Sequence, residues 1–276
     1  MINKNVVLSP KLDFKILKCK LIDKGRITPI ILRLRIANKY LARCAHPGQF
    51  VNIKVSTSYV PLLRRPFSIH RVDQEKEWFE ILFQVIGKGT ELLADFEAGD
   101  ELDILGPLGN HFIFPEDCNH AVLIAGGLGI APLLFLAQEL TNQNVPTTLF
   151  YGNKSKEFFC SLQDFDELGI PHFLATEDGS LSFKGKVTDL FLVKQETIQE
   201  CNTMVYACGP NPMLQRIKEI ADQLSLPCQV SLETMMACGF GACLGCVVNS
   251  TSSSDPYKYV CKDGPVFNTS EIDLSE

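Results

Sequence analysis

The chain has 276 residues, of which 46% are hydrophobic and 21% charged, so its composition is that of a globular protein and excludes a largely disordered chain. It carries 26 Lys and Arg against 32 Asp and Glu, a net charge of −6, which argues against nucleic acid as the main ligand because phosphate binding needs a basic surface. The length predicts about two domains, with room for a small third.

Neither a targeting signal nor a membrane span is expected. The first fifteen residues, MINKNVVLSPKLDFK, contain no apolar run of the kind found in secretory signals. Residues 118–138 carry no charge, but three glycines and Pro132 interrupt this run, so strand, glycine turn and helix explain it better than a spanning helix. We therefore expect a cytoplasmic protein, in which clustered cysteines are metal ligands more often than disulfides.

Residues 1–116 are rich in strand patterns. Runs at 31–36, 50–55 and 78–86 are β-branched or aromatic and are separated by Gly and Pro turns. One helical segment, 90–96, follows Gly87-Lys88-Gly89. Several short strands with few helices predict a small antiparallel barrel.

Residues 117–227 alternate between apolar strand runs and helical patterns. The strand runs are 121–125, 147–151, 171–175 and 203–207, and the helical patterns are 132–141, 158–168 and 210–224. This alternation predicts a doubly wound parallel sheet in an α/β domain.

Residues 228–276 form a short third segment, rich in Cys and Gly. About fifty residues are too few for a substantial core, so we expect this segment to rest on the other two domains or on a partner. Four of the eleven cysteines lie here, in the spacing Cys238-x4-Cys243-x2-Cys246-x14-Cys261.

This spacing is that of plant-type [2Fe–2S] proteins, in which one loop supplies three ligands and a later segment supplies the fourth. The intervening residues Gly239 to Ala242 are nearly free of bulk, so their backbone N–H groups are able to point at the sulfurs. Structural zinc sites usually pair their cysteines as two knuckles. The spacing therefore favours iron–sulfur over zinc, which remains the alternative.

Two segments of the β-rich region have the chemistry of a pyrophosphate site. Arg64-Arg65-Pro66-Phe67-Ser68 supplies cations and a hydroxyl, and Gly87-Lys88-Gly89-Thr90 opens a helix whose first N–H groups are free to bind an anion. Each segment alone is equally compatible with an ordinary strand and turn.

A second nucleotide site is predicted in the α/β region. Gly126, Gly127 and Gly129 lie between an apolar strand and Pro132, which suits a first helical turn. The segment Cys208-Gly209-Pro210 ends another strand, where ligands of open α/β sheets bind. The glycine turn lacks the G-x-G-x-x-G pattern, and a purely structural turn remains the alternative.

Taken in order, these motifs resemble the ferredoxin–NADP reductase superfamily: RPFS at 65–68, GKGT at 87–90, GPLGN at 106–110, AGGLGIAP at 125–132, YGNK at 151–154 and CGPNPM at 208–213. The C-terminal extension, with its cysteine spacing and VCKDGPVF at 260–267, resembles the electron-transfer subunits of type B dihydroorotate dehydrogenases. Together the two resemblances cover nearly the whole chain.

The resemblance implies three cofactors and their residues. FAD is held by the Arg65, Pro66, Phe67 and Ser68 segment, by the pair Gly89 and Thr90, and by a strand at Leu82, Phe83 and Gln84. Relatives often have Tyr-Arg where this chain has Phe83-Gln84, so we expect Arg64 or Lys88 to replace the missing charge. NAD is held by Gly126, Gly127, Gly129, Cys208, Gly209 and Pro210, and Cys208 lies near the nicotinamide. The cluster is held by Cys238, Cys243, Cys246 and Cys261.

NADH is the expected nucleotide. In NADPH-specific relatives, basic and hydroxyl side chains after the third strand meet the 2′-phosphate. Here that place holds Glu177 and Asp178, whose charge repels a phosphate, although Lys154 and Lys156 in the preceding loop act against this preference.

These three sites form a redox relay. Nicotinamide donates two electrons as hydride, whereas an iron–sulfur cluster carries one electron at a time. Flavin accepts hydride and also releases single electrons, so the flavin must lie between the nicotinamide and the cluster. The chemistry belongs to the cofactors, so no catalytic side chain is expected. Oxidising dihydroorotate needs its own flavin and base, normally on a (β/α)8 barrel of about 250 residues, for which this chain has no room. The resemblance implies a partner FMN subunit, in a heterotetramer of two subunits of each kind, within pyrimidine biosynthesis.

Two alternatives are also compatible with the sequence. The first is the electron-transfer subunit of another NAD(P)H-linked complex, such as a sulfhydrogenase or an NADH-dependent ferredoxin reductase. The second is not an enzyme: a zinc-stabilised nucleotide-binding protein. Visible absorbance separates them, because flavin and cluster are coloured and zinc is not.

Overall fold

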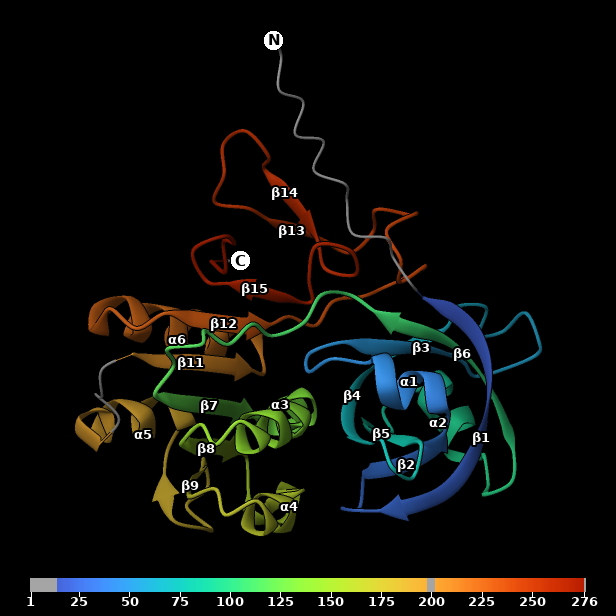
Figure 1. The fold of residues 1–276 in the computed structure, drawn as a ribbon, viewed down its shortest axis with the longest axis horizontal. Helices are drawn as coiled ribbons and strands as arrows, with labels where there is room; N and C mark the ends of the chain where they lie inside the picture. The colour runs from blue at the N-terminus through green and yellow to red at the C-terminus, as the bar shows by residue number, and fades with distance from the viewer. Residues whose placement is uncertain (1–13, 198–201, 276) are drawn as a thin grey trace.

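The computed structural model describes residues 14–197 and 202–275. It contains an antiparallel barrel and an α/β unit side by side, with the C-terminal segment lying across both (Figure 1). This is the predicted architecture.

The N-terminal barrel closes in the strand order β1-β2-β5-β4-β3-β6. Its strands are β1 (Lys15–Arg26), β2 (Ile31–Ala37), β3 (Phe50–Lys54), β4 (Arg65–Asp73), β5 (Trp78–Gln84) and β6 (Glu101–Leu108), with short helices α1 (Lys39–Cys44) and α2 (Lys88–Ala94). Alternate apolar side chains fill the interior, as a closed barrel of this size requires. The flavin motif 65–68 therefore lies at the start of β4, and α2 begins directly after β5.

The second unit is a seven-stranded sheet in the order β10-β9-β8-β7-β11-β12-β15. Its strands from the 117–227 region are β7 (His120–Gly126), β8 (Thr147–Asn153), β9 (His172–Thr176), β10 (Phe183–Lys184) and β11 (Thr203–Cys208), all parallel. Two separate cores lie on its faces, one containing α3 (Ile130–Asn142) and α4 (Leu162–Glu167), the other α5 (Val187–Val193) and α6 (Asn211–Leu224). The sheet is thus doubly wound, as predicted.

The predicted helix over 158–168 is shorter than expected. Residues 156–158 form one 3-10 turn, and Ser161 adopts a left-handed conformation with φ of +59°. Because that conformation interrupts a right-handed helix, α4 begins only at Leu162. Two further 3-10 turns occur at Gly127–Gly129 and Gln195–Thr197.

The C-terminal segment has no core of its own. Its strands β12 (Cys228–Ser231) and β15 (Val266–Asn268) extend the α/β sheet, while β13 (Val247–Asn249) and β14 (Tyr257–Tyr259) form a separate hairpin. Cys246, Val260 and Cys261 are buried in the core that α5 and α6 share. The division of the chain at 116/117 and 227/228 remains our proposal, with two strands of the last segment belonging to the sheet of the one before.

None of the helices in the described ranges is long and apolar enough to cross a membrane. The uncharged run at 118–138 forms the buried strand β7, a glycine turn and the buried helix α3.

Candidate functional site

A cleft of about 670 Å³ lies at the carboxyl ends of the parallel strands. It is lined by residues of the α/β unit and by Ile30, Ile31 and Gln84 of the barrel. Ligands of open α/β sheets bind at this edge, so the cleft is the candidate NAD site. Gln84, predicted from the sequence as a flavin contact, lies at its border with the barrel.

The two predicted NAD segments meet in this cleft. A Cβ on Gly126 would stand 2.5 Å from the sulfur of Met213, and one on Gly209 would stand 3.2 Å from the Cα of Gly126. A Cβ on Gly129 would overlap the carbonyl oxygen of Cys208. Only glycines allow the two turns to approach so closely, which explains why both segments are rich in them.

Cys208 itself is buried between these turns. Burial, and secondly the nearby Glu233 carboxylate, raise the pKa of its thiol well above the usual range, so the thiol is protonated at neutral pH. Gly209 is half-buried and Pro210 exposed, and Pro210 lines the cleft. Cys208 therefore contributes a small neutral group under the cleft floor.

The cleft wall carries both signs of charge. Glu177 and Asp189 line the cleft, together with Lys154, Lys186 and Arg216. Asp178, the other acid of the predicted pair, is not among the lining residues; its carboxylate accepts a hydrogen bond from the backbone N–H of Ser180 at 2.9 Å. Sequence reasoning missed Lys186 and Arg216, because no motif brings them near the glycine turn.

The flavin segments meet at one end of the barrel. A Cβ on Gly89 would stand 2.5 Å from the Nε atom of Arg65, so the guanidinium lies against the start of α2. The Thr90 hydroxyl accepts hydrogen bonds from the backbone N–H groups of Ile86 (3.0 Å) and Gly87 (3.1 Å), which closes the helix start. Arginine and helix start thus form one positive surface, suited to a pyrophosphate.

The aromatic residues of these segments face inward. Phe67 and Phe83 belong to the barrel core, with ring centroids 5.6 Å apart, and Leu82 packs against the α3 side of the sheet. Their rings therefore support the strands, whereas the half-buried Arg65, Pro66, Ser68 and Gln84 remain accessible to a ligand.

Arg64 does not replace the charge missing at Gln84. Its guanidinium binds the Asp103 carboxylate at 2.6 Å and the Asp103 carbonyl oxygen at 2.8 Å on β6. Lys88 lies beside Glu91 at 3.9 Å and is mainly exposed. Among the three expected cations, Arg65 alone lies against the start of α2 without a carboxylate partner in the described residues.

The four cysteines form an inner and an outer pair. The Sγ atoms of Cys246 and Cys261 lie 3.2 Å apart and are buried, whereas Cys238 is half-exposed and Cys243 exposed. Positive φ angles at Gly239 (+81°), Gly241 (+87°) and Leu244 (+57°) wrap the loop around this centre. The four cysteines, which come from two segments of the chain, are the candidate ligands of a cluster.

Backbone N–H groups point at the sulfurs. Gly241 donates to the Cys261 sulfur at 3.1 Å, Cys243 to that of Cys238 at 3.4 Å and Cys261 to that of Cys246 at 3.4 Å. Burial opposes ionisation of Cys238, but N–H groups of the loop outweigh it and lower its pKa to about 6. Burial, followed by the neighbouring Cys246, raises the pKa of Cys261 to about 12. The loop thus favours the thiolate of Cys238, the form that binds iron.

A hydrogen bond joins the barrel to the cluster loop. Asn52 on β3 is buried and donates from Nδ2 to the Cys238 carbonyl oxygen at 3.2 Å. Its neighbour across the strands is Pro66 of the flavin motif. No sequence signal marks it, since its role depends on contact with a loop 186 residues away.

Comparison with known families agrees with this geometry. Residues 233–273 match the model of the iron-sulfur cluster binding domain of dihydroorotate dehydrogenase B, and residues 123–219 match the oxidoreductase NAD-binding domain. The electron transfer subunit of dihydroorotate dehydrogenase B from Desulforamulus reducens is 37% identical over 259 residues, which cover 94% of this chain and 98% of that one. This chain belongs to that family.

A second relative, the corresponding subunit from Geobacillus kaustophilus, is 39% identical over 244 residues, covering 87% of this chain and 92% of the relative. Among solved structures, the NADH-dependent reduced ferredoxin–NADP oxidoreductase has a TM-score of 0.81 and 28% identity, covering 94% of this chain and 90% of that one. The chain is therefore an oxidoreductase subunit with sites for FAD, a [2Fe–2S] cluster and NAD. The match at 233–273 selects iron–sulfur over zinc.

Proposed function

We propose that this chain carries electrons from dihydroorotate oxidation on a partner FMN subunit, through its [2Fe–2S] cluster and FAD, to NAD+. Its relatives are named as electron transfer subunits of the NAD+-linked dihydroorotate dehydrogenase B, an enzyme of pyrimidine biosynthesis. When bound, flavin exchanges hydride with nicotinamide and single electrons with a cluster.

This proposal rests on the position of the flavin strand β4 in the barrel, between a strand that borders the NAD cleft and a strand that contacts the cluster loop. Gln84, at the end of β5, borders the NAD cleft, and Asn52, on β3, contacts the cluster loop. The flavin motif on β4 lies between those two strands in the barrel sheet. A flavin held there has the nicotinamide site on one side and the iron site on the other.

The site residues follow from this arrangement. The proposed FAD contacts are Arg65, Pro66, Ser68, Gln84, Gly89 and Thr90, with Phe67, Leu82 and Phe83 supporting the strands. The proposed NAD contacts are Gly126, Gly127, Gly129, Gly209, Pro210 and the buried Cys208. The proposed cluster ligands are Cys238, Cys243, Cys246 and Cys261. No side chain needs to act as an acid or base, since the chain's residues bind and orient the cofactors and exclude water from them.

The partner is proposed to dock beside the exposed edge of the cluster. An apolar groove of about 420 Å³ adjoins Cys238 and is lined by Phe14, Ile16, Leu62, Leu63 and Phe240, among others. Leu62 is 70% exposed, Leu244 52% and Met235 90%. Exposed apolar surface around a redox centre favours a protein partner, which we take to be the FMN subunit, in an assembly of two copies of each.

We further propose that the chain works in the cytoplasm and uses NADH. The cysteines of the described residues are free thiols, which suit a reducing compartment. Glu177 in the cleft wall disfavours a 2′-phosphate.

Reconstitution with and without the partner tests this function. The FAD- and cluster-loaded chain alone is expected to reduce artificial dyes with NADH and to leave dihydroorotate unchanged. Addition of the FMN subunit is expected to couple dihydroorotate oxidation to NAD+ reduction. Dihydroorotate turnover by the chain alone, or a complex that fails to reduce NAD+, would contradict the proposal.

A second candidate function rests on one observation. The solved structure of an NADH-dependent reduced ferredoxin–NADP oxidoreductase covers 94% of this chain with a TM-score of 0.81. In that case the partner would be a ferredoxin-linked subunit. Co-purification distinguishes the two, because a bound FMN barrel subunit supports the first and a ferredoxin-dependent partner supports the second.

A further inference from the structure

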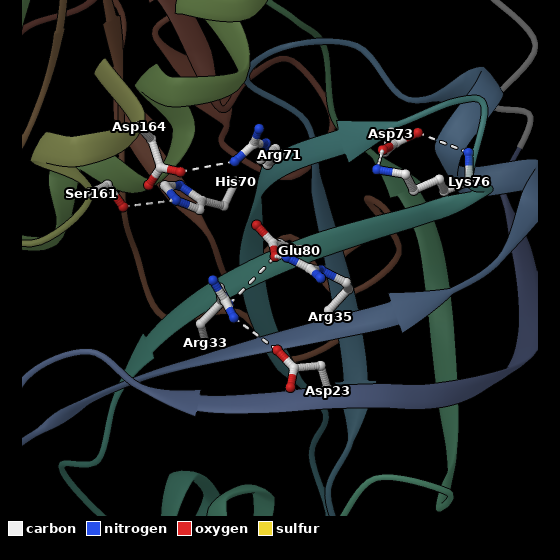
Figure 2. A network of polar contacts seen from close by, with 10 residues as sticks. All are labelled: Asp23, Arg33, Arg35, His70, Arg71, Asp73, Lys76, Glu80, Ser161 and Asp164. Carbon is white, nitrogen blue, oxygen red and sulfur yellow. Dashed lines mark hydrogen bonds and ion pairs between the residues drawn. The ribbon is translucent and has the colours of Figure 1, made fainter. Parts of the chain in front are cut away.

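His70 lies on the same strand as the flavin motif, two residues after Ser68. Its side chain is buried, with 1% of its surface exposed, at the junction between the barrel and the α/β unit. Figure 2 shows the ring pointing out of β4 toward Ser161, next to the pair formed by Arg71 and Asp164.

Both ring nitrogens of His70 are used across this junction. Nδ1 lies 2.8 Å from the carbonyl oxygen of Ala131, and Nε2 lies 3.0 Å from the hydroxyl oxygen of Ser161. Because a carbonyl only accepts, Nδ1 carries the proton and donates it, and the neutral ring accepts from Ser161 at Nε2. The ring is thus held in one tautomer by two partners of the other unit.

Ala131 lies beside the glycine turn of the NAD site. It follows Gly129 by two residues, at the start of α3. The imidazole therefore joins the strand that carries the flavin motif to the start of the helix that follows the NAD glycine turn. The neighbouring pair Arg71–Asp164, at 2.8 Å, fastens the same strand to α4, but both of its side chains are about 30% exposed.

We propose that His70 is the positioning residue for the hydride step: it fixes the nicotinamide turn relative to the flavin strand. This inference rests on the proposed function. Hydride transfer depends on near-contact geometry, and a misplacement of about 1 Å costs on the order of 100-fold in rate. Removing the ring is expected to slow the step while the two binding sites remain present.

A separate observation indicates that Asn52 is a positioning residue for the cluster loop, as His70 is for the NAD site. Its side chain is fully buried, and Nδ2 reaches the Cys238 carbonyl oxygen, whereas Oδ1 has no hydrogen-bond partner among the described residues. A buried unpaired acceptor is unfavourable, so an apolar residue would suit this buried position better. A Cβ on Gly239 would also stand 2.5 Å from Nδ2, so the loop is shaped to receive this amide. Asn52 thereby positions the backbone of Cys238 against β3, the neighbour of the flavin strand.

The two residues predict opposite defects, so each variant serves as the control for the other. His70→Ala is expected to slow NADH-to-FAD transfer about tenfold or more in the chain loaded with FAD and cluster. The dissociation constant for NADH is expected to change much less, and the rate of FAD-to-cluster transfer is expected to stay unchanged. Asn52→Leu is expected to slow FAD-to-cluster transfer and to leave NADH-to-FAD transfer unchanged. Stopped-flow absorbance separates the two steps.

Structural readouts accompany the rates. In His70→Ala, amide exchange is expected to rise at 126–135, and the long-wavelength absorbance of the NADH–flavin complex is expected to fall. In Asn52→Leu, the g-values of the reduced cluster are expected to shift in electron paramagnetic resonance. His70→Asn keeps a donor near the Nδ1 position and is expected to restore most of the hydride rate, and Ser161→Ala, which keeps the ring, gives a milder form of the same defect.

Three results would overturn the assignments. Equal slowing of both steps by either variant would indicate general loosening of the fold, and unchanged steps would show that neither side chain positions its motif. Failure of His70→Asn to recover any rate would contradict the role of the Nδ1 donor. If the wild-type chain itself fails to reduce its FAD with NADH, the proposed function fails instead, and this outcome is distinct from the others.

Discussion

Gly129 packs directly against the carbonyl oxygen of Cys208, so the turn after β7 and the end of β11 share one surface. The two residues are far apart in sequence, yet their strands are neighbours in the sheet. Their contact shapes the floor of the NAD cleft.

Gly129→Ala is expected to lower stability and NADH binding together, because its Cβ would overlap the Cys208 carbonyl and overpacking costs about 1–3 kcal/mol. Thermal unfolding and NADH titration measure the two effects. Gly25→Ala is the control, since its Cβ would make an ordinary 3.4 Å contact with the Arg33 side chain. Unchanged unfolding of Gly129→Ala would contradict this account of the floor.

Arg65→Ala is expected to weaken FAD binding by about 10- to 100-fold, the value of a lost charge-assisted contact to phosphate. Gly89→Ala should weaken it similarly by displacing the guanidinium. Lys88→Ala, which removes a mainly exposed cation, is the control. The FAD content of each variant after dialysis measures the effect. Equal retention of FAD by Arg65→Ala and Lys88→Ala would contradict the role of Arg65 in FAD binding.

Glu177→Gln is expected to raise the ratio of NADPH to NADH efficiency by about tenfold, since it removes a carboxylate from a cleft that also holds three cations. Asp178→Asn is a matched control with the same change of charge one residue further on, outside the lining. Steady-state dye reduction with each nucleotide tests the pair. An equal effect of both changes would indicate a general electrostatic field rather than a specificity residue.

Acid is expected to destabilise the junction through His70. Burial, opposed in part by the Ala131 hydrogen bond, lowers its pKa to about 4, with Arg71 and Arg33 adding to the shift, so the unfolded chain binds the proton more readily. The stability contributed by the neutral ring is complete above the unfolded pKa of about 6.5 and falls as the pH drops toward 4, by about 3 kcal/mol in total.

Denaturant unfolding of the wild type and of His70→Asn measures this effect. The difference in unfolding free energy between pH 7 and pH 4.5 should be smaller in the variant, which has no imidazole to protonate at this position. An identical pH dependence would show that other groups cause the acid sensitivity.

Removal of the cluster with a chelator is expected to increase amide exchange at 238–246 and to lower the thermal midpoint, because this loop holds three residues at positive φ around its ligands. The barrel strands should exchange as before. Cys243→Ser should reproduce the effect, while Cys44→Ser, which changes an exposed thiol outside the cluster, should not. Unchanged exchange in the metal-free protein would mean that the loop holds its shape unaided.

The sequence by itself determined the architecture and proposed the ligand set of the cluster. Strand runs, helical patterns and glycine turns are local properties, so the barrel, the doubly wound sheet and the order of the motifs could be predicted from short stretches of chain. The spacing of Cys238, Cys243, Cys246 and Cys261 is equally local for three of the four ligands.

The tertiary structure alone decided how those parts are joined. It placed the rings of Phe67 and Phe83 in the barrel core, committed Arg64 to Asp103 and brought Lys186 and Arg216 to the cleft. It also brought His70 to Ala131 and Asn52 to Cys238, across 61 and 186 residues of chain. Such contacts depend on where separate strands meet after folding, and no local pattern of side chains encodes that meeting.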